Sequence, residues 1–218
     1  IEKEKLGGTC LNRGCIPTKA LLHASSLFAT MQSCDEFGVS VENMAFDFKK
    51  MQQCKKKAVQ AYRDKVEEQF EKLGIDLIQG TATIRRDKRV EVNSLCGKEY
   101  YCAQNIIIAT GAAAKMPDIP GIGLEGVWNS DRLLAADNWK FDQITIVGGG
   151  VIGVEIATIF HNLCSKVTII EQGSQLLGPV DHEVAAALKE DLTSKGILVY
   201  CNAAPKEIVK DNGLVCRF

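Results

Sequence analysis

Residues 144–153 of the 218-residue chain read ITIVGGGVIG, an apolar run followed by closely spaced glycines. The apolar run predicts a buried strand, and the glycines lead into a helical stretch and a second strand at 166–170. In such a turn Gly148 permits a tight bend, Gly150 lets a pyrophosphate approach the backbone, and Gly153 lets helix and strand pack closely. The pattern therefore predicts an α/β protein with a dinucleotide site.

Glu171 ends the second predicted strand, about twenty residues beyond the glycines. A carboxylate at this place accepts hydrogen bonds from the ribose hydroxyls of NAD and repels the 2′-phosphate of NADP. The next residues, Gln172 and Gly173, offer no arginine for such a phosphate. The sequence favours NAD; the alternative is a solvent-facing acid at the end of a strand.

A second motif lies far upstream, where residues 7–19 read GGTCLNRGCIPTK. Four residues separate Cys10 from Cys15, which differs from the Cys-x-x-Cys spacing of zinc sites, and no second ligand pair follows. We therefore expect no metal site. Pro17 suits the first turn of a helix, and a helix N-terminus lowers the pKa of a nearby thiol. A structural disulfide or two reduced core cysteines are the alternatives to a reactive pair.

These two motifs resemble those of the flavoprotein disulfide reductases, and within them the dihydrolipoamide dehydrogenases. The resemblance implies a redox-active disulfide in which Cys10 exchanges with the substrate and Cys15 lies against the flavin. It also implies FAD and NAD as cofactors, and two Rossmann-like nucleotide-binding domains with a β-meander, both incomplete here. Arg13 and Thr18 stand where the family more often has Val and Ser. We expect these changes to be tolerated.

The resemblance implies five further cofactor-binding residues. Glu2 stands where an acid binds the adenosine ribose of FAD, and the backbone at Thr110 and Gly111 is expected to pass the flavin. Lys19 and Glu155 are expected to meet beside the flavin N5, although either could be an exposed helix charge. The FAD-binding glycines do not precede Glu2, so the opening residues read as a truncated beginning, and autonomous FAD binding is not expected.

Between the motifs, periodicity and turn residues predict a long helix, a series of short strands and a connector. The helix is expected at 47–73, the strands at 76–78, 81–84, 89–92, 100–102 and 105–109, and the connector, with a helix at 130–136, up to Lys140. A boundary near Phe141 divides the chain into a partial FAD-binding domain with the redox disulfide, 1–141, and a partial NAD-binding domain, 142–218.

Composition narrows the classes of partner. A formal charge of −1, with both signs interspersed, provides no basic surface for nucleic acid. Nine cysteines without the pattern of a small disulfide-rich scaffold favour the reducing cytoplasm. No apolar run has the length of a membrane span. The three histidines, His23, His161 and His182, are expected to be structural or exposed rather than catalytic.

The resemblance implies an enzyme that oxidises dihydrolipoamide on a lipoyl-bearing protein, through the disulfide and FAD, to reduce NAD. It implies a homodimer in the full-length enzyme, whose partner subunit supplies a His-Glu base, so this chain alone is expected to be inactive. Two alternatives stay open: another NAD(P)H-dependent disulfide reductase, and a truncated, non-enzymatic nucleotide-binding module.

Overall fold

The computed structural model describes residues 1–137 and 141–218, which form two compact units. The first, here called the meander unit, comprises 1–17 and 56–113, and the second, the nucleotide unit, comprises 18–55 and 114–218. The domain boundary near residue 141 stays a prediction. Of the expected connector, residues 138–140 lie outside the described chain.

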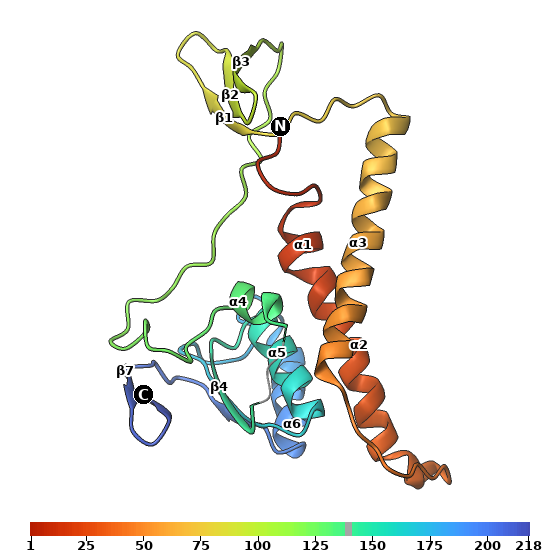
Figure 1. Ribbon diagram of the computed structural model, residues 1–218. Coiled ribbons are helices and arrows are strands. Elements are labelled where there is room, and N and C mark those ends of the chain that lie inside the picture. The colour runs from red at the N-terminus through yellow and green to blue at the C-terminus, as the bar shows by residue number, and fades with distance from the viewer. Residues whose placement is uncertain (138–140) are drawn as a thin grey trace. The chain divides into compact units, whose positions relative to one another are not determined.

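The meander unit takes its name from a three-stranded antiparallel sheet (Figure 1). Strands β1 (Thr81–Ile84), β2 (Val90–Ser94) and β3 (Gly97–Tyr101) follow each other along the chain and across the sheet. The central strand is the buried one, and Val92 has no exposed surface. The unit also contains the short helix α1 (Gly8–Arg13). The predicted strand at 81–84 is confirmed, the one at 89–92 is shifted by one or two residues at its ends, and the one predicted at 100–102 begins three residues earlier.

Two long helices follow α1 along the chain. Helix α2 (Cys15–Gln32) is followed by the 3₁₀ turn η1 (Cys34–Phe37), and α3 (Phe48–Lys72) confirms the helix predicted at 47–73. Gly74, with φ +61°, follows the end of α3, where glycine adopts the left-handed conformation that stops a helix without strain.

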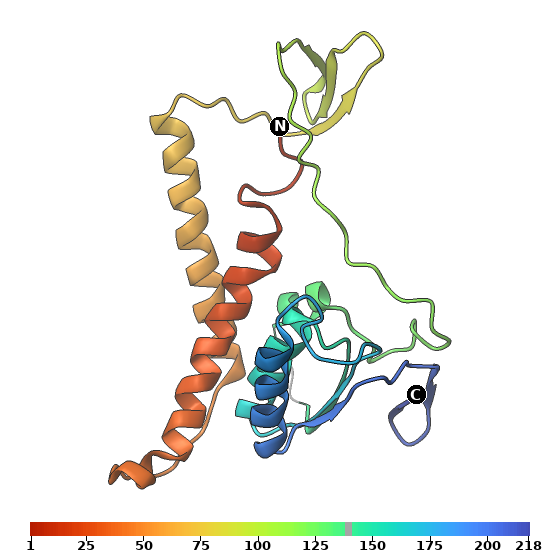
Figure 2. The ribbon, with the colours of Figure 1, turned by 180° about the vertical axis from the view of Figure 1, so that it is seen from behind.

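The nucleotide unit is built on a parallel sheet of β4 (Gln143–Val147), β5 (Lys166–Ile170) and β6 (Leu198–Tyr200), in that spatial order. Helix α5 (Val151–Asn162) connects β4 to β5, and α6 (His182–Ser194) connects β5 to β6. Figures 1 and 2 show both helices on the same face of the sheet, as successive right-handed crossovers require. The predicted α/β architecture is confirmed.

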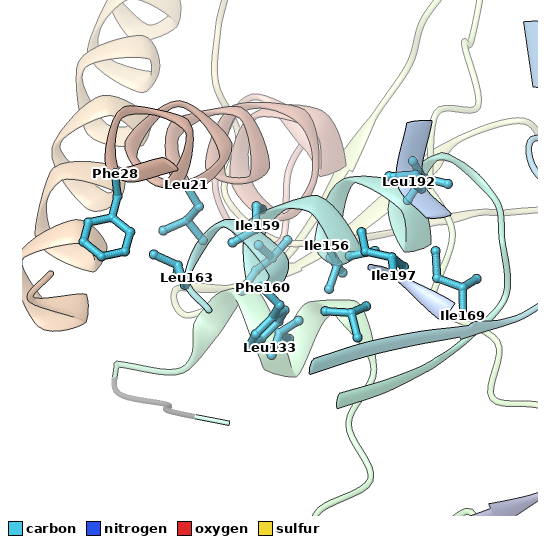
Figure 3. Close-up of a cluster of buried hydrophobic side chains, with 14 of the residues drawn as sticks. Leu21, Phe28, Leu133, Ile156, Ile159, Phe160, Leu163, Ile169, Leu192 and Ile197 are labelled. Atoms are coloured by element: carbon cyan, nitrogen blue, oxygen red, sulfur yellow. The ribbon is translucent and has the colours of Figure 1, made fainter. Parts of the chain in front are cut away.

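One hydrophobic cluster holds the nucleotide unit together. Ile159 and Phe160 of α5 are almost fully buried, and Leu21 and Phe28 of α2 belong to the same cluster (Figure 3). Helix α2 therefore buries apolar side chains with the helix that begins at the glycine-rich turn.

A hairpin of β7 (Glu207–Lys210) and β8 (Leu214–Arg217) ends the chain, and α4 (Ser130–Ala135) precedes β4. The hairpin is joined to the connector, because the Ile208 N–H donates to the Pro120 carbonyl at 2.8 Å. A Cβ at Gly121 would lie 1.8 Å from the Ile208 carbonyl oxygen, so only glycine fits there.

Two predicted strands are wrong. At 76–78 the chain is irregular, and only the neighbouring Gln79 forms a single parallel bridge, with Glu2. The run 105–109 is also irregular, and the exposed fractions of Ile107 and Ile108 are 90% and 71%. Apolar composition alone does not make a strand, because a strand needs a hydrogen-bonded neighbour, and no described residue pairs with this run.

Candidate functional site

The glycine-rich turn between β4 and α5 has the geometry of a dinucleotide loop. Gly148 has φ +110°, a conformation in which a side chain would be strained. A Cβ at Gly153 would lie 2.0 Å from the Gly148 carbonyl oxygen, whereas a Cβ at Gly150 would meet no atom within 4 Å. Gly153 therefore serves packing, and the space above Gly150 is open to a ligand.

The first turn of α5 suits a phosphate group. Its N-cap, Gly150, provides no side-chain cap, and the turn carries no acidic residue. The Val154 N–H donates to the Gly150 carbonyl at 3.0 Å, so the N–H groups of residues 151–153 precede the first intrahelical bond. Uncapped N–H groups at a helix N-terminus attract anions. Together with the open space at Gly150, they fit a pyrophosphate.

Glu171 lies directly beyond β5 and holds the loop in place. Its carboxylate accepts the N–H of Gly149 and the N–H of Gly173, each at 2.6 Å. Its own N–H donates to the Tyr200 carbonyl at 2.8 Å, which ties the residue to β6. A carboxylate has about four acceptor sites, so the half-buried side chain can still accept from ribose hydroxyls. The predicted residues Gly148, Gly150, Gly153 and Glu171 therefore gather at one end of the sheet.

Cys10 and Cys15 form a disulfide in the meander unit, with Cα atoms 4.6 Å apart. Cys10 lies in α1 and Cys15 is the first residue of α2. Both residues are exposed, so a dissolved thiol can reach them. Gly7, the N-cap of α1, has φ +103°, and a Cβ there would lie 2.6 Å from Leu11 Cδ1.

The predicted pair Lys19 and Glu155 is in contact. The ammonium group of Lys19, in α2, donates to the carboxylate of Glu155, in α5. The exposed fractions of the two side chains are 55% and 20%.

The other residues predicted for FAD, besides the pair Lys19 and Glu155, lie in the meander unit, and their role stays a prediction. Glu2 accepts the N–H of Glu4 at 2.8 Å, and Thr110 and Gly111 lie in an exposed irregular stretch. In the chain outside 138–140, the only strand–glycine turn–helix unit is the one at β4 and α5. This unit therefore fits a dinucleotide.

Sequence reasoning did not find Arg63, whose guanidinium donates to Asn12, between the two cysteines, at 2.7 Å. The two residues are 51 positions apart, and an arginine on an amphipathic helix gives no signal of such a contact. Within 1–137 and 141–218, no group of three His, Cys, Asp or Glu residues could hold a metal ion. Over the same residues, no helix is long and apolar enough to cross a membrane.

An exposed disulfide and a dinucleotide loop in one α/β chain define a class of redox protein that uses nucleotide cofactors. The family model described as pyridine nucleotide-disulphide oxidoreductase matches residues 1–217. The chain belongs to this family, which implies an FAD-dependent oxidoreductase that binds NAD(P).

Several curated relatives are similar over nearly the whole chain. The dihydrolipoyl dehydrogenase of Acholeplasma laidlawii is 38% identical over 95% of this chain and 62% of its own length. A dihydrolipoyl dehydrogenase of Bacillus subtilis is 36% identical over 90% of this chain and 43% of its own length. The chain thus spans only 43% to 62% of the length of these relatives.

Solved structures show the same fold. The HOCl-induced flavoprotein disulfide reductase RclA from Escherichia coli superimposes with a TM-score of 0.79 at 32% identity, covering 98% of this chain and 46% of that one. A Cu(II) complex of the same protein gives a TM-score of 0.78 at 30% identity.

Proposed function

We propose that this chain carries the disulfide and the NAD site of a dihydrolipoamide-oxidising enzyme. The observation that carries the proposal is the exposed Cys10–Cys15 disulfide in a family member that also has a dinucleotide loop. The similarity to dihydrolipoyl dehydrogenases supports dihydrolipoamide as the reductant. The whole enzyme's homodimer, its lipoyl-bearing protein partner and its cytoplasmic location belong to the same proposal.

The cysteines act by thiol–disulfide exchange. One thiolate of dihydrolipoamide attacks the Cys10 sulfur, which breaks the Cys10–Cys15 bond and releases the Cys15 thiolate. The second thiol of the substrate then attacks the mixed disulfide, releasing the Cys10 thiolate and the cyclic disulfide lipoamide. Two electrons pass from substrate to protein, and the two protons of the substrate thiols go to the released thiolates or to water, so the exchange balances. The start of α2 stabilises negative charge on Cys15, because the N-terminal end of a helix dipole is positive.

NAD is the hydride acceptor in this proposal, and Glu171 selects it. Its carboxylate faces the loop whose Gly149 N–H it accepts, so a 2′-phosphate bound there would meet a fixed negative charge. The Gly150 backbone and the first turn of α5 hold the pyrophosphate. The flavin that the family implies would be held in part by the residues predicted for it, and when bound it would carry electrons from the cysteines to NAD.

Stoichiometric exchange tests the proposal. The chain is incubated anaerobically with dihydrolipoamide, alkylated with iodoacetamide and analysed by mass spectrometry. We expect Cys10 and Cys15 to change from disulfide to alkylated thiols with one lipoamide formed per chain. Cys10→Ser should yield none, while Cys96→Ser, which removes an exposed free thiol of the same unit, should behave as the parent. A disulfide that dihydrolipoamide leaves intact would refute the proposal.

A second candidate is another disulfide reductase. The fold similarity to RclA, whose name specifies a flavoprotein disulfide reductase, favours it. In the same assay, reduction by glutathione at rates above those of dihydrolipoamide would select this candidate.

A further inference from the structure

The disulfide loop is held by a hydrogen-bond network within the meander unit. Asn12, between the two cysteines, donates through Nδ2 to the Leu6 carbonyl at 2.9 Å and to the Gly8 carbonyl at 3.0 Å. A longer contact of 3.5 Å reaches the Lys5 carbonyl. The Asn12 side chain thus ties α1 to the segment that leads into it.

Arg63 holds Asn12 from the opposite side. Its Nη2 donates to Asn12 Oδ1 at 2.7 Å, and its Nη1 donates to Gln60 Oε1 at 2.7 Å. Gln60 is fixed in turn, since its Nε2 donates to Asp64 Oδ1 at 2.6 Å. The guanidinium is therefore anchored on α3 and orients the amide of Asn12 so that its nitrogen faces the carbonyls.

We propose that Arg63 is a positioning residue for the Cys10–Cys15 couple, acting through Asn12 to keep the two sulfurs close when the disulfide is open. The inference rests on the proposed redox role of the disulfide. Closing a disulfide depends on the effective concentration of one thiol at the other, and that concentration falls as the intervening chain becomes free to move. The network restrains that intervening chain.

The direction in which the reduction potential changes distinguishes a positioning role of Arg63 from a purely electrostatic one. Reduction adds two electrons and two protons and breaks the sulfur–sulfur bond. Loss of the network makes the disulfide less stable relative to the two thiols, so reduction becomes more favourable. Loss of a positive charge near a thiolate has the opposite effect, because the reduced form is then stabilised less. Removing a positioning residue therefore raises the reduction potential of the disulfide, whereas removing a purely electrostatic one lowers it.

The test measures the equilibrium between the full 218-residue chain and dithiothreitol, which supplies the electrons and protons, by alkylation and mass spectrometry. Charge-assisted hydrogen bonds contribute on the order of a tenfold change in an equilibrium constant. We expect Arg63→Ala and Asn12→Ala each to raise the reduction constant about tenfold, or by about 30 mV for this two-electron couple. The double variant should equal Asn12→Ala alone, because the two residues act as one unit.

Two further variants distinguish a specific effect of Arg63 from a general loss of charge or of folding. Arg86→Ala removes an exposed arginine of the same unit and should leave the constant unchanged. If Arg63→Ala does not fold, Arg63→Lys, which keeps the charge but loses the planar donor pair, should still raise the constant. An unchanged or lowered constant, or additive effects in the double variant, would overturn the inference. A parent disulfide that dithiothreitol cannot open reversibly would instead refute the proposed redox function.

Discussion

Lys19 and Glu155 form an ion pair between α2, which begins at a disulfide cysteine, and α5, which begins at the glycine-rich turn. The residues are 136 positions apart in the chain, yet both belong to the nucleotide unit. The contact therefore links two helices whose first residues come from the two motifs of the sequence.

We expect this ion pair to contribute little to stability. Lys19 is more than half exposed, and exposed pairs contribute about 0.2–1 kcal/mol in water. A double-mutant cycle with Lys19→Ala and Glu155→Ala, followed by urea unfolding, should give a coupling energy within this range that decreases with added salt. The exposed pair Arg13–Glu4, at 2.7 Å, is the matched control. A coupling energy of several kcal/mol would contradict the expectation.

Two glycine variants should separate packing from binding. Gly153→Ala places a methyl group against the Gly148 carbonyl oxygen and should lower the unfolding temperature. Gly150→Ala meets no protein atom and has an unstrained φ of −73°, so it should fold normally while the methyl group hinders a pyrophosphate. Thermal unfolding and NAD titration calorimetry measure the two effects. Equal losses of stability in both variants would show that Gly150 also serves packing.

Glu171→Ala should reduce the preference for NAD over NADP. The substitution removes the acceptor for ribose hydroxyls and the charge that opposes a 2′-phosphate, and we expect NAD affinity to fall about tenfold. Calorimetric titration with each dinucleotide measures the ratio. Gln172→Ala, at the next and exposed position, is the control and should bind as the parent does. An unchanged ratio would make Glu171 a purely structural residue of the loop.

Glu91 should make stability depend on pH in the acid range. This buried carboxylate of β2 accepts hydrogen bonds chiefly from Arg85, with Lys98 at 3.4 Å, and its pKa is lowered to about 2. The ordinary pKa is 4.5, so the stabilisation is fully present above that value and is lost as the pH falls toward 2. The free energy of unfolding, measured with denaturant at several pH values in this range, should rise with pH. Glu91→Gln should make this pH dependence weaker. The exposed Glu42→Gln should retain the slope of the parent.

The sequence predicted the nucleotide unit well because its signals are local. Strand β5 has the predicted ends, 166 and 170, and the glycines occupy the turn expected of them. A tight turn, a helix N-terminus and an acid at a strand end are each defined by neighbours along the chain. Glu171 lies where expected, but its bonds to Gly149 and Gly173 could not be predicted from the strand pattern.

The remaining features depend on partners far away in sequence. The run 105–109 has the composition of a buried strand, and yet its isoleucines are exposed, because pairing decides whether a strand forms. Glu2 stands where an acid was expected, but its carboxylate bonds to Glu4. The contact of Arg63 with Asn12 has no sequence signal, since charged residues on a helix face are usually solvated.

The two backbone bonds that Glu171 accepts at the glycine-rich turn bear on the thermodynamics of cofactor capture. Folding itself fixes the loop, so a dinucleotide need not immobilise it, and the ordering entropy that opposes association is correspondingly smaller. The carboxylate thus preorganises the loop for binding. A variant without it should show a larger unfavourable entropy of NAD binding in addition to any lost enthalpy.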